Sequence, residues 1–396
     1  MLIITFFVYK WKPFILTNFL KKLKVYKNFY KLYDIIKKVV IKMKVLIMID
    51  SFKGSMESKT VNKIVSKQLR KKNIKSDCYS ISDGGEGFLD AINFGYKKRH
   101  LKVKDALNKN IKSYYLYDKD SAYIELAKVC GLAMIKNKNP MYTSTYGGGQ
   151  LIKDAVTRGY KNIYIGIGGS STNDLGLGII EALGAKFYHN EEELTFITGE
   201  KMGLVTRIDY SEVISKIEGL NFYCLSDVTN PLLGKNGASY TYAKQKGASK
   251  EEIEILEKNA INIVNILGFS RKYHLEKSSG ASGGVGYILQ AIFNSKVISG
   301  INFLLDKINF ENISKDYDFI ITGEGKIDSQ SISGKVIDGI CKKTTNKVVA
   351  IVGINELFNN PYDNLKVYAI TPKYASIDQS ICNPKYYLKK LIKDVF

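Results

Sequence analysis

The chain has 396 residues, of which 45% are hydrophobic and 24% are charged, so wholesale disorder is excluded and two or three domains are expected. It has no run of eighteen apolar residues, which argues against an ordinary membrane-spanning protein. The formal net charge is +21, but neither a stacking platform nor a basic repeat accompanies it, so we expect no nucleic-acid partner. Five widely spaced Cys without a zinc spacing fit reduced thiols in a cytoplasmic protein with no stable membrane insertion.

Residues 1–42 differ from the rest of the chain, because they hold ten Lys, no Arg, no Ser and a single acid, Asp34. An apolar run at Leu2–Tyr9 precedes a basic amphipathic stretch at Leu20–Ile41. This order does not suit a secretory signal, and the composition does not suit an organelle transit peptide. We interpret 1–42 as a basic N-terminal extension outside the fold, with Met43 as the working start. Surface association with a membrane and targeting remain open.

From Met43 the chain alternates strands and helices. Four continuous apolar, β-branched runs predict strands buried on both faces, and each is followed by a polar or Gly-rich turn: 44–49, 162–167, 317–322 and 348–353. The first is followed by a helix with Val61, Val65 and Leu69 on its apolar face. Such a pattern favours a Rossmann-like parallel sheet, with the turns gathered at its carboxyl edge.

The expected fold class is α/β, with a second, mixed α/β domain inserted into the Rossmann-like domain. We assign 43–80, 128–190 and 296–396 to the Rossmann-like domain, and 81–127 and 191–295 to the inserted one. The inserted domain is expected to contain short strands near 113–117 and 122–126. The active site is expected in the cleft between the two domains.

Glycine-rich turns point to bound phosphate, because successive backbone N–H groups converge there on an anion. Turns of this kind occur at 166–171, 280–286 and 323–325. The expected phosphate- or nucleotide-binding residues are Gly168, Gly169, Ser170, Gly283, Gly284, Gly323 and Gly325. The Walker A and G-x-G-x-x-G spacings are both absent, which disfavours a P-loop NTPase and a dinucleotide dehydrogenase.

Carboxylates recur in these polar turns, at Asp50, Asp83, Glu86, Asp174, Asp227, Glu324 and Asp328. Oxygen ligands of this type suit Mg²⁺, and a carboxylate also accepts the proton of a hydroxyl. The chain has three His, none beside one of these turns, and no legible nucleophile motif. Phosphoryl transfer therefore fits best, since it needs positioning, cations and one base.

With these turns and carboxylates taken together, the chain resembles the bacterial glycerate kinase type I family from Met43 to about residue 355. The resemblance is carried by eight blocks in the same order: Asp50–Lys53, Asp83–Gly87, Asn139–Pro140 with Ser144–Gly147, Gly166–Ser170 with Thr172–Asp174, Asp227–Val228 with Asn230–Leu232, Gln245–Ala248, Gly283–Gly284 with Gly286, and Ile321–Gly325 with Asp328. Departures from the family pattern occur at Ile49, Phe88, Leu175 and Ser282, and none removes a carboxylate of the set.

The resemblance implies ATP-dependent phosphorylation of D-glycerate to a phosphoglycerate on two α/β domains, with ATP and Mg²⁺ as cofactors. As a hypothesis for the site, Asp83 or Asp227 takes the hydroxyl proton and Lys53 neutralises the transferred charge. Substrate oxygens would be oriented by Asp50, Ser51, Glu86 and Asn230. The metal or phosphates would be held by Asp174, Glu324 and Asp328.

Three other functions remain open at this point: an inactive relative that only binds phosphometabolites, a kinase for another small hydroxy acid, and a protein that binds nucleic acid or a membrane surface through its basic charge. The phosphorylated hydroxyl and the oligomeric state, a homodimer included, are also open.

Overall fold

The computed structural model describes residues 43–396, apart from 53–54, 330 and 333. Residues 1–42 lie outside the described residues, and so does the interpretation of a basic extension. The unit Lys44–Phe396 is described below. In this part of the chain, no helix is long and apolar enough to cross a membrane.

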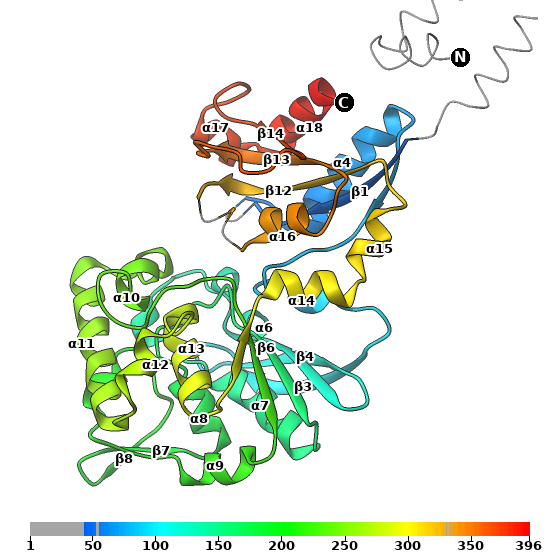
Figure 1. The fold of residues 1–396 in the computed structure, drawn as a ribbon. Coiled ribbons are helices and arrows are strands. Elements are labelled where there is room, and N and C mark those ends of the chain that lie inside the picture. Colours follow the sequence, from blue (N-terminus) through cyan, green and yellow to red (C-terminus); the bar gives the residue numbers. More distant parts are fainter. Residues whose placement is uncertain (1–42, 53–54, 330, 333) are drawn as a thin grey trace, which may run out of the picture. The chain divides into compact units, whose positions relative to one another are not determined.

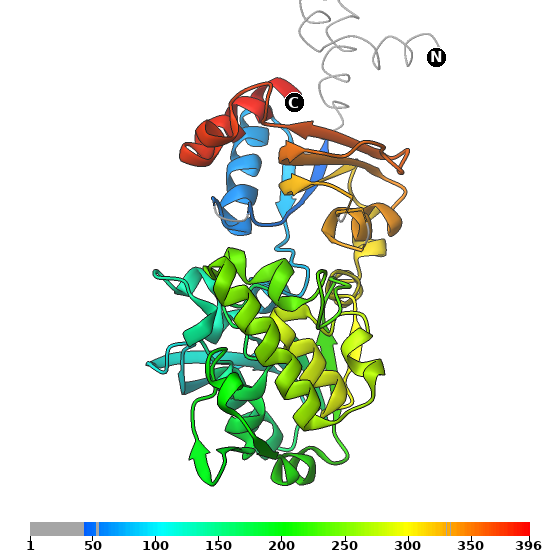
Figure 2. The ribbon, with the colours of Figure 1, turned by 90° about the vertical axis from the view of Figure 1, so that its left-hand side faces the viewer.

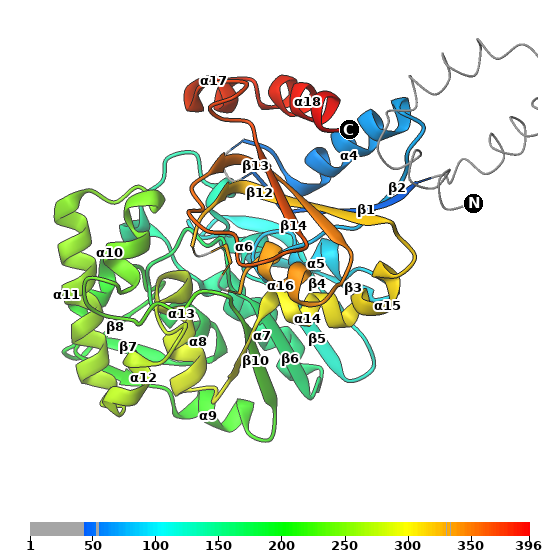
Figure 3. The same cartoon turned by 45° about the horizontal axis from the view of Figure 1, so that its top comes forward.

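One sheet consists of five parallel strands in the order β14-β13-β12-β1-β2. Its strands come from both ends of the unit: β1 (Lys44–Ile49), β2 (Lys75–Cys78), β12 (Phe319–Ile327), β13 (Lys347–Asn355) and β14 (Leu365–Ala369). As its apolar run predicted, β1 is buried almost throughout. Helices α4 (Ser58–Lys71) and α18 (Pro384–Val395) lie on one face, and α16 (Val336–Lys342) lies on the other (Figures 1 and 3).

A six-stranded sheet lies in the chain between β2 and β12, in the order β11-β10-β6-β5-β4-β3. Its strands are β3 (Lys97–Lys104), β4 (Asn110–Tyr117), β5 (Ser121–Glu125), β6 (Asn162–Gly166), β10 (Asn221–Leu225) and β11 (Lys296–Ile298). The strands β5, β6, β10 and β11 are parallel to one another, while β4 is antiparallel to both β3 and β5. A mixed α/β fold is thus confirmed, with a parallel sheet and a mixed sheet.

The pairing of one strand differs from expectation. Residues 162–167 were expected to share the first sheet, but β6 pairs with β5 and β10 in the six-stranded sheet. An apolar run shows that a strand is buried, but it does not show which sheet the strand joins. The partner is set by the crossover helix α7 (Tyr146–Thr157), which leads from β5 to a parallel neighbour. The domain boundaries given above stay a prediction.

Most of the remaining helices surround the six-stranded sheet, and Figure 2 shows the green-to-yellow group gathered in front of it. Two do not: α15 contacts α14, and α17 contacts α18 beside the five-stranded sheet. Their bounds are α5 (Phe88–Ala91), α6 (Ala127–Cys130), α8 (Leu177–Leu183), α9 (Ser211–Ile217), α10 (Ala238–Tyr242), α11 (Lys250–Leu267), α12 (Arg271–Leu275), α13 (Ala281–Ala291), α14 (Gly300–Lys307), α15 (Phe310–Ser314) and α17 (Ile377–Cys382). A small antiparallel sheet consists of β7 (Lys186–His189), β8 (Glu192–Leu194) and β9 (Arg207–Asp209).

Helix α14 contacts both major parts of the fold. Its Phe303 ring lies 4.9 Å from that of Tyr164 in β6. At Ile301 it packs against α16 so closely that a Cβ on Gly339 would lie 2.8 Å from the Ile301 side chain. One hydrophobic core accordingly includes residues of β1, β12, α14 and α16, and another fills the space between the six-stranded sheet and α7, α8 and α13. The start of α14 is therefore held from both sides.

Candidate active site

The carboxyl ends of three parallel strands meet at one edge of the six-stranded sheet. Glu125, Gly166 and Leu225 end β5, β6 and β10, and they stand in register. The loop Asp83–Gly87 crosses this edge closely: a Cβ on Gly166 would lie 2.6 Å from the carbonyl oxygen of Gly84. Glycine is therefore required where strand and loop touch, and the loop's polar groups are placed where ligands bind in parallel sheets.

A buried carboxylate that the sequence analysis missed fixes this loop. Glu125 is 1% exposed and accepts hydrogen bonds from the amides of Gly87 (3.0 Å) and Leu89 (2.9 Å). Burial raises the pKa of Glu125, while the Lys128 ammonium and the two amides oppose that rise. The available signal was a Glu at the end of an apolar strand, because a buried acid there needs donors.

Asp227 lies at the amino-terminal end of α14. Its two carboxylate oxygens accept hydrogen bonds of 3.0 Å each from the amides of Gly300 and Ile301. Burial raises the pKa of Asp227 to about 7; the Ser299 hydroxyl and both amides act against the rise, and the charge of Asp83 adds to it. A carboxylate with this pKa is suited to accept a proton at neutral pH.

Asp83 and Asp227 are brought together by the same glycine. A Cβ on Gly300 would lie 2.2 Å from the carbonyl oxygen of Asp83, so only glycine allows this approach. The Asp83 carboxylate accepts a hydrogen bond of 3.2 Å from the amide of Gly85 in its own loop. The two candidate bases therefore sit at one place, although they are far apart in the sequence.

The turn Gly168–Ser170 lies against the Asp83 loop, since a Cβ on Gly168 would be 2.8 Å from the Cα of Gly85. The backbone N–H groups of Gly168, Gly169 and Ser170 donate to no other described residue. Gly168 is half-buried and Gly169 is exposed, with a φ of +79° that favours glycine. Three successive N–H groups without a described acceptor are the donors that an anion would need at this turn.

Neighbouring bonds hold this turn in place. The amide of Leu132 donates to the carbonyl of Gly169 (2.9 Å), and the amide of Ser171 donates to that of Cys130 (2.8 Å). The backbone nitrogen of Glu86 lies 3.5 Å from where a Cβ on Gly169 would sit. Glu86 itself is exposed. The structure thus brings together four predicted positions, Glu86 and the three of the turn.

The other predicted phosphate turn is packed against protein. Ser282, Gly283 and Gly284 all have positive φ, and both glycines are buried. A Cβ on Gly283 would lie 2.1 Å from the carbonyl oxygen of Thr172, and one on Gly284 would lie 2.8 Å from the Leu175 side chain. The observed role of these glycines is close packing, and phosphate binding by them stays a prediction.

The expectation that a strand ends at Thr322 and leads into a glycine turn is wrong. Strand β12 continues to Ile327, and Gly323 and Gly325 lie within it. Pairing with β13 extends through these positions, and a Cβ on Gly323 would lie 1.8 Å from the carbonyl oxygen of Ile351. Here glycine permits close strand approach instead of forming a turn.

The predicted metal ligands are not assembled into a cluster. Asp174 is fully buried, and its carboxylate accepts hydrogen bonds from Thr145 (amide 2.7 Å, hydroxyl 2.8 Å) and from the amides of Gly176 and Gly178 (3.3 Å each). In the described part of the chain, no group of three or more His, Cys, Asp or Glu side chains could hold a metal ion. With Glu324 and Asp328, Asp174 therefore does not provide a ready divalent-cation site.

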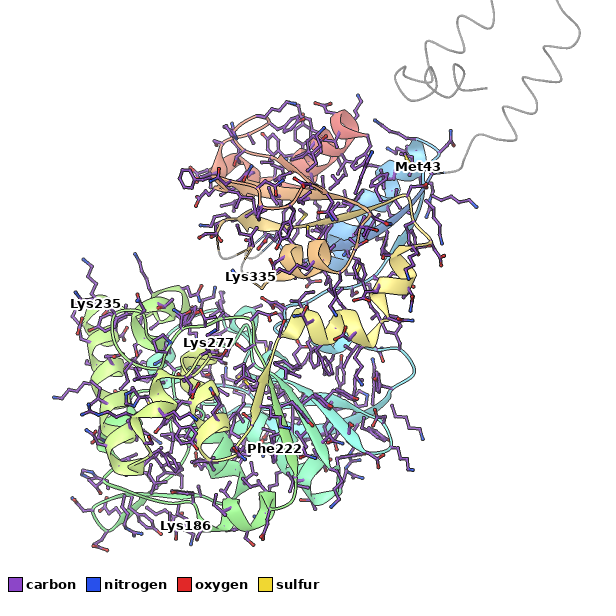
Figure 4. All side chains as sticks on the ribbon, viewed as in Figure 1. Met43, Lys186, Phe222, Lys235, Lys277 and Lys335 are labelled. Carbon is purple, nitrogen blue, oxygen red and sulfur yellow. The ribbon has the colours of Figure 1, made fainter. Side chains whose placement is uncertain are left out.

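Asp328 instead pairs with a lysine on its own segment. Its carboxylate lies 3.2 Å from the Lys326 ammonium. Burial acts to raise the pKa of Asp328, but Lys326, the amide of Ser331 and the charge of Lys335 keep it below its usual value. Lys335, labelled in Figure 4, immediately precedes α16. Asp328 therefore forms an ion pair with the end of β12.

Asp50 and Ser51 follow β1 directly. The amide of Asp50 donates to the carbonyl of Gly323 (2.9 Å), and the amide of Ser51 donates to the Asp50 carboxylate (2.7 Å). The buried side chain of Asn62 binds both the amide and the carbonyl of Ile49, at 3.0 Å each, and so fixes the strand end. Lys53 lies outside the described residues.

Asn230 is occupied within its own loop. Its side-chain amide donates to the carbonyl of Asn236 (2.9 Å), and its oxygen accepts from the Tyr242 hydroxyl (2.6 Å). Its predicted contact with substrate stays a prediction, and the observed role is to hold this loop.

Comparison with known proteins agrees with this picture. The family model described as the glycerate kinase family matches residues 45–396. A protein of Halalkalibacterium halodurans named glycerate kinase is 31% identical over 367 residues, covering 89% of this chain and 97% of the relative. A protein of Escherichia coli K12 named glycerate 2-kinase is 35% identical over 329 residues, covering 78% of this chain and 85% of the relative.

The fold also matches a solved structure. The crystal structure of a proposed glycerate kinase 2 from Salmonella typhimurium LT2 superposes with a TM-score of 0.64 at 29% identity, covering 89% of this chain and 98% of that one. The match therefore extends over nearly the whole fold and is not limited to the candidate site.

Proposed function

Because the chain belongs to the glycerate kinase family and is a kinase that phosphorylates glycerate, we propose that it transfers the γ-phosphoryl group of ATP to the 2-hydroxyl of D-glycerate. The observation that supports the assignment most is the contact between two loops: the Asp83–Gly87 loop beside Asp227, and the Gly168–Ser170 turn with open N–H groups. A base and an anion site next to each other are what phosphoryl transfer requires.

Asp227 is the proposed general base. It accepts the proton of the glycerate hydroxyl as the oxygen attacks the γ-phosphorus and the bond to the ADP oxygen breaks. Its pKa of about 7 keeps a large share of the carboxylate ionised at neutral pH while it remains basic enough to take a proton. Asp83 adds negative charge beside it and so strengthens the base.

The proposed phosphate contact is the turn Gly168–Ser170. Phosphate oxygens would accept hydrogen bonds from its three N–H groups, which donate to no other described residue. The expected Mg²⁺ does not fit the set Asp174, Glu324 and Asp328, so no step is assigned to it. We propose that the ion enters with the nucleotide, since Mg²⁺ is typically held by phosphate oxygens and one or two carboxylates.

The E. coli relative is named glycerate 2-kinase, and this name supports phosphorylation at the 2-hydroxyl. A direct assay tests the position. The full chain would be incubated with ATP, Mg²⁺ and D-glycerate, and the product would be resolved by ³¹P NMR. The proposal predicts 2-phosphoglycerate and ADP in equal amounts. Formation of 3-phosphoglycerate would overturn the position only. Nucleotide binding without turnover would favour another hydroxy acid, to be tested in a panel, or a relative that only binds phosphometabolites.

A further inference from the structure

A buried lysine lies behind the Gly168–Ser170 turn and plays no part in the function proposed so far. Lys246 is 3% exposed, and its ammonium donates to the carbonyl of Thr172 (2.6 Å) and to the hydroxyl of Ser170 (3.3 Å). Within the described residues it forms no ion pair with a carboxylate. A cation is thus held one hydrogen bond away from the open turn.

The backbone around Lys246 fixes this position. The next residue, Gly247, has a φ of +98°, and a Cβ there would lie 2.0 Å from the carbonyl oxygen of Lys138. Only glycine allows this close approach, which fixes the backbone beside Lys246. The hydrogen bond to Ser170 spans 76 residues of sequence.

The surroundings of Lys246 are polar and incompletely paired. Thr172 and Asn173 are fully buried, and neither the Thr172 hydroxyl nor the Asn173 side-chain oxygen has a hydrogen-bond partner. Burying an ammonium without a paired anion is unfavourable, and so is leaving buried polar atoms unpaired. Buried polar groups left unpaired in this way call for an explanation, and an ion or ligand bound nearby is one.

We propose that Lys246 is a positioning residue whose positive charge, acting through Ser170 and the Thr172 carbonyl, strengthens the binding of an anionic group at the Gly168–Ser170 turn. The ligand chemistry is a cluster of anionic oxygens, supplied by a phosphate of the nucleotide or by the carboxylate of glycerate. This inference rests on the proposed function, because it assigns a partner to the same turn.

Burial lowers the pKa of Lys246 to about 8, and the charged or titratable groups that act on it are Cys130 and Asp174. Burial also raises the pKa of the Cys130 thiol to about 12, so the thiol stays neutral in this range. Asp174 is held by its own four donors. The charge behind the turn therefore falls as the pH rises above about 8.

The test uses two probes on the full chain. Sulfate represents phosphate, because it does not change protonation between pH 7 and pH 10, and D-glycerate alone represents the carboxylate. Their dissociation constants would be measured by NMR titration for the native chain, Lys246→Met, Lys246→Arg and Lys244→Met. Lys244 is an exposed lysine on the same short helical turn and serves as the matched control.

The expected result is about tenfold weaker binding of one probe by Lys246→Met, with native-like binding by Lys246→Arg and Lys244→Met. The probe that weakens identifies the source of the anion. In the native chain the same probe should bind about tenfold more weakly at pH 9.5 than at pH 7.5, and this loss should be absent in Lys246→Met.

Unchanged binding of both probes by a folded Lys246→Met would overturn the inference. If Lys246→Met does not fold, the inference would instead be overturned by the native chain binding both probes with the same affinity at pH 7.5 and pH 9.5. Failure of this inference can be distinguished from failure of the proposed function, because turnover of glycerate by the native chain is measured in a separate assay. Turnover with unchanged probe binding removes only the role of Lys246.

Discussion

The amide of Gly300 donates a 3.0 Å hydrogen bond to the carboxylate of Asp227. The same glycine lies so close to the Asp83 loop that no side chain fits between them. One residue without a side chain thus sets the distance between two acids. Burial, with a smaller addition from the charge of the neighbouring Asp83, raises the pKa of Asp227 on which the proposed mechanism depends.

The rate of phosphoryl transfer should depend on the ionisation of Asp227. With saturating MgATP, kcat/KM for D-glycerate should rise about tenfold per pH unit below pH 7 and level off above it, following the pKa of about 7. Initial rates between pH 5.5 and pH 8 check this. A flat profile over that range would show that another group accepts the proton.

The ionisation of Asp227 should also affect stability, but in the opposite direction: as the pH rises, the rate increases and the free energy of unfolding decreases. Folding raises the pKa of Asp227 from 3.8 to about 7, so between these values the folded state binds a proton that the unfolded chain does not. The contribution of Asp227 to the free energy of unfolding therefore decreases as the pH rises. Between pH 5 and pH 7.5 the native chain should lose about 2–3 kcal/mol relative to Asp227→Asn, measured by urea unfolding.

The turn at Gly169 offers a matched pair of substitutions. Gly169 and Gly159 have φ near +80°, and a Cβ on either would meet no atom closer than 3.5 Å. Both Gly169→Ala and Gly159→Ala should cost about 1 kcal/mol of stability. Only Gly169→Ala should weaken nucleotide binding, by about tenfold, since it disturbs the open N–H groups. Equal nucleotide affinity in the two variants would argue against a phosphate site at this turn.

Glu125 should act through the loop that it holds. Glu125→Gln puts an amide N–H opposite the amide of either Gly87 or Leu89, so one buried hydrogen bond is lost. We expect a loss of about 1–3 kcal/mol in unfolding free energy and a lower kcat, because the Asp83 loop is no longer fixed. Exposed Asp209→Asn is the control and should change neither quantity. Native stability of Glu125→Gln would contradict the assigned role.

Much of the fold follows from local patterns in the sequence. The buried run at Lys44–Ile49 is strand β1, and the stripe with Val61, Val65 and Leu69 is the buried face of α4. The short strands expected near 113–117 and 122–126 are β4 and β5, which pair in antiparallel fashion. These predictions succeeded because apolar periodicity reports burial directly. The same signal does not encode strand partners, and for this reason Asn162–Gly166 was placed in the wrong sheet.

The site was predicted in part. The polar turns led to Asp83, Asp227 and Gly168–Ser170, which the structure brings to one place through loop contacts and shared charge. Asp174 was expected at a metal, but its surroundings saturate it with protein donors, which depends on distant residues such as Thr145. For Glu125 the sequence signalled a buried acid at a strand end, but neither its partner nor that of Lys246 could be read from the sequence, because Leu89 and Ser170 lie 36 and 76 positions away.

The most direct test of the account is the turnover of Asp227→Asn with ATP and D-glycerate. The account predicts that kcat falls by about 10²–10⁴-fold while nucleotide affinity stays near that of the native chain, since the base is lost and the anion turn is kept. Native kcat in a correctly folded Asp227→Asn would contradict the assignment of Asp227 as the base.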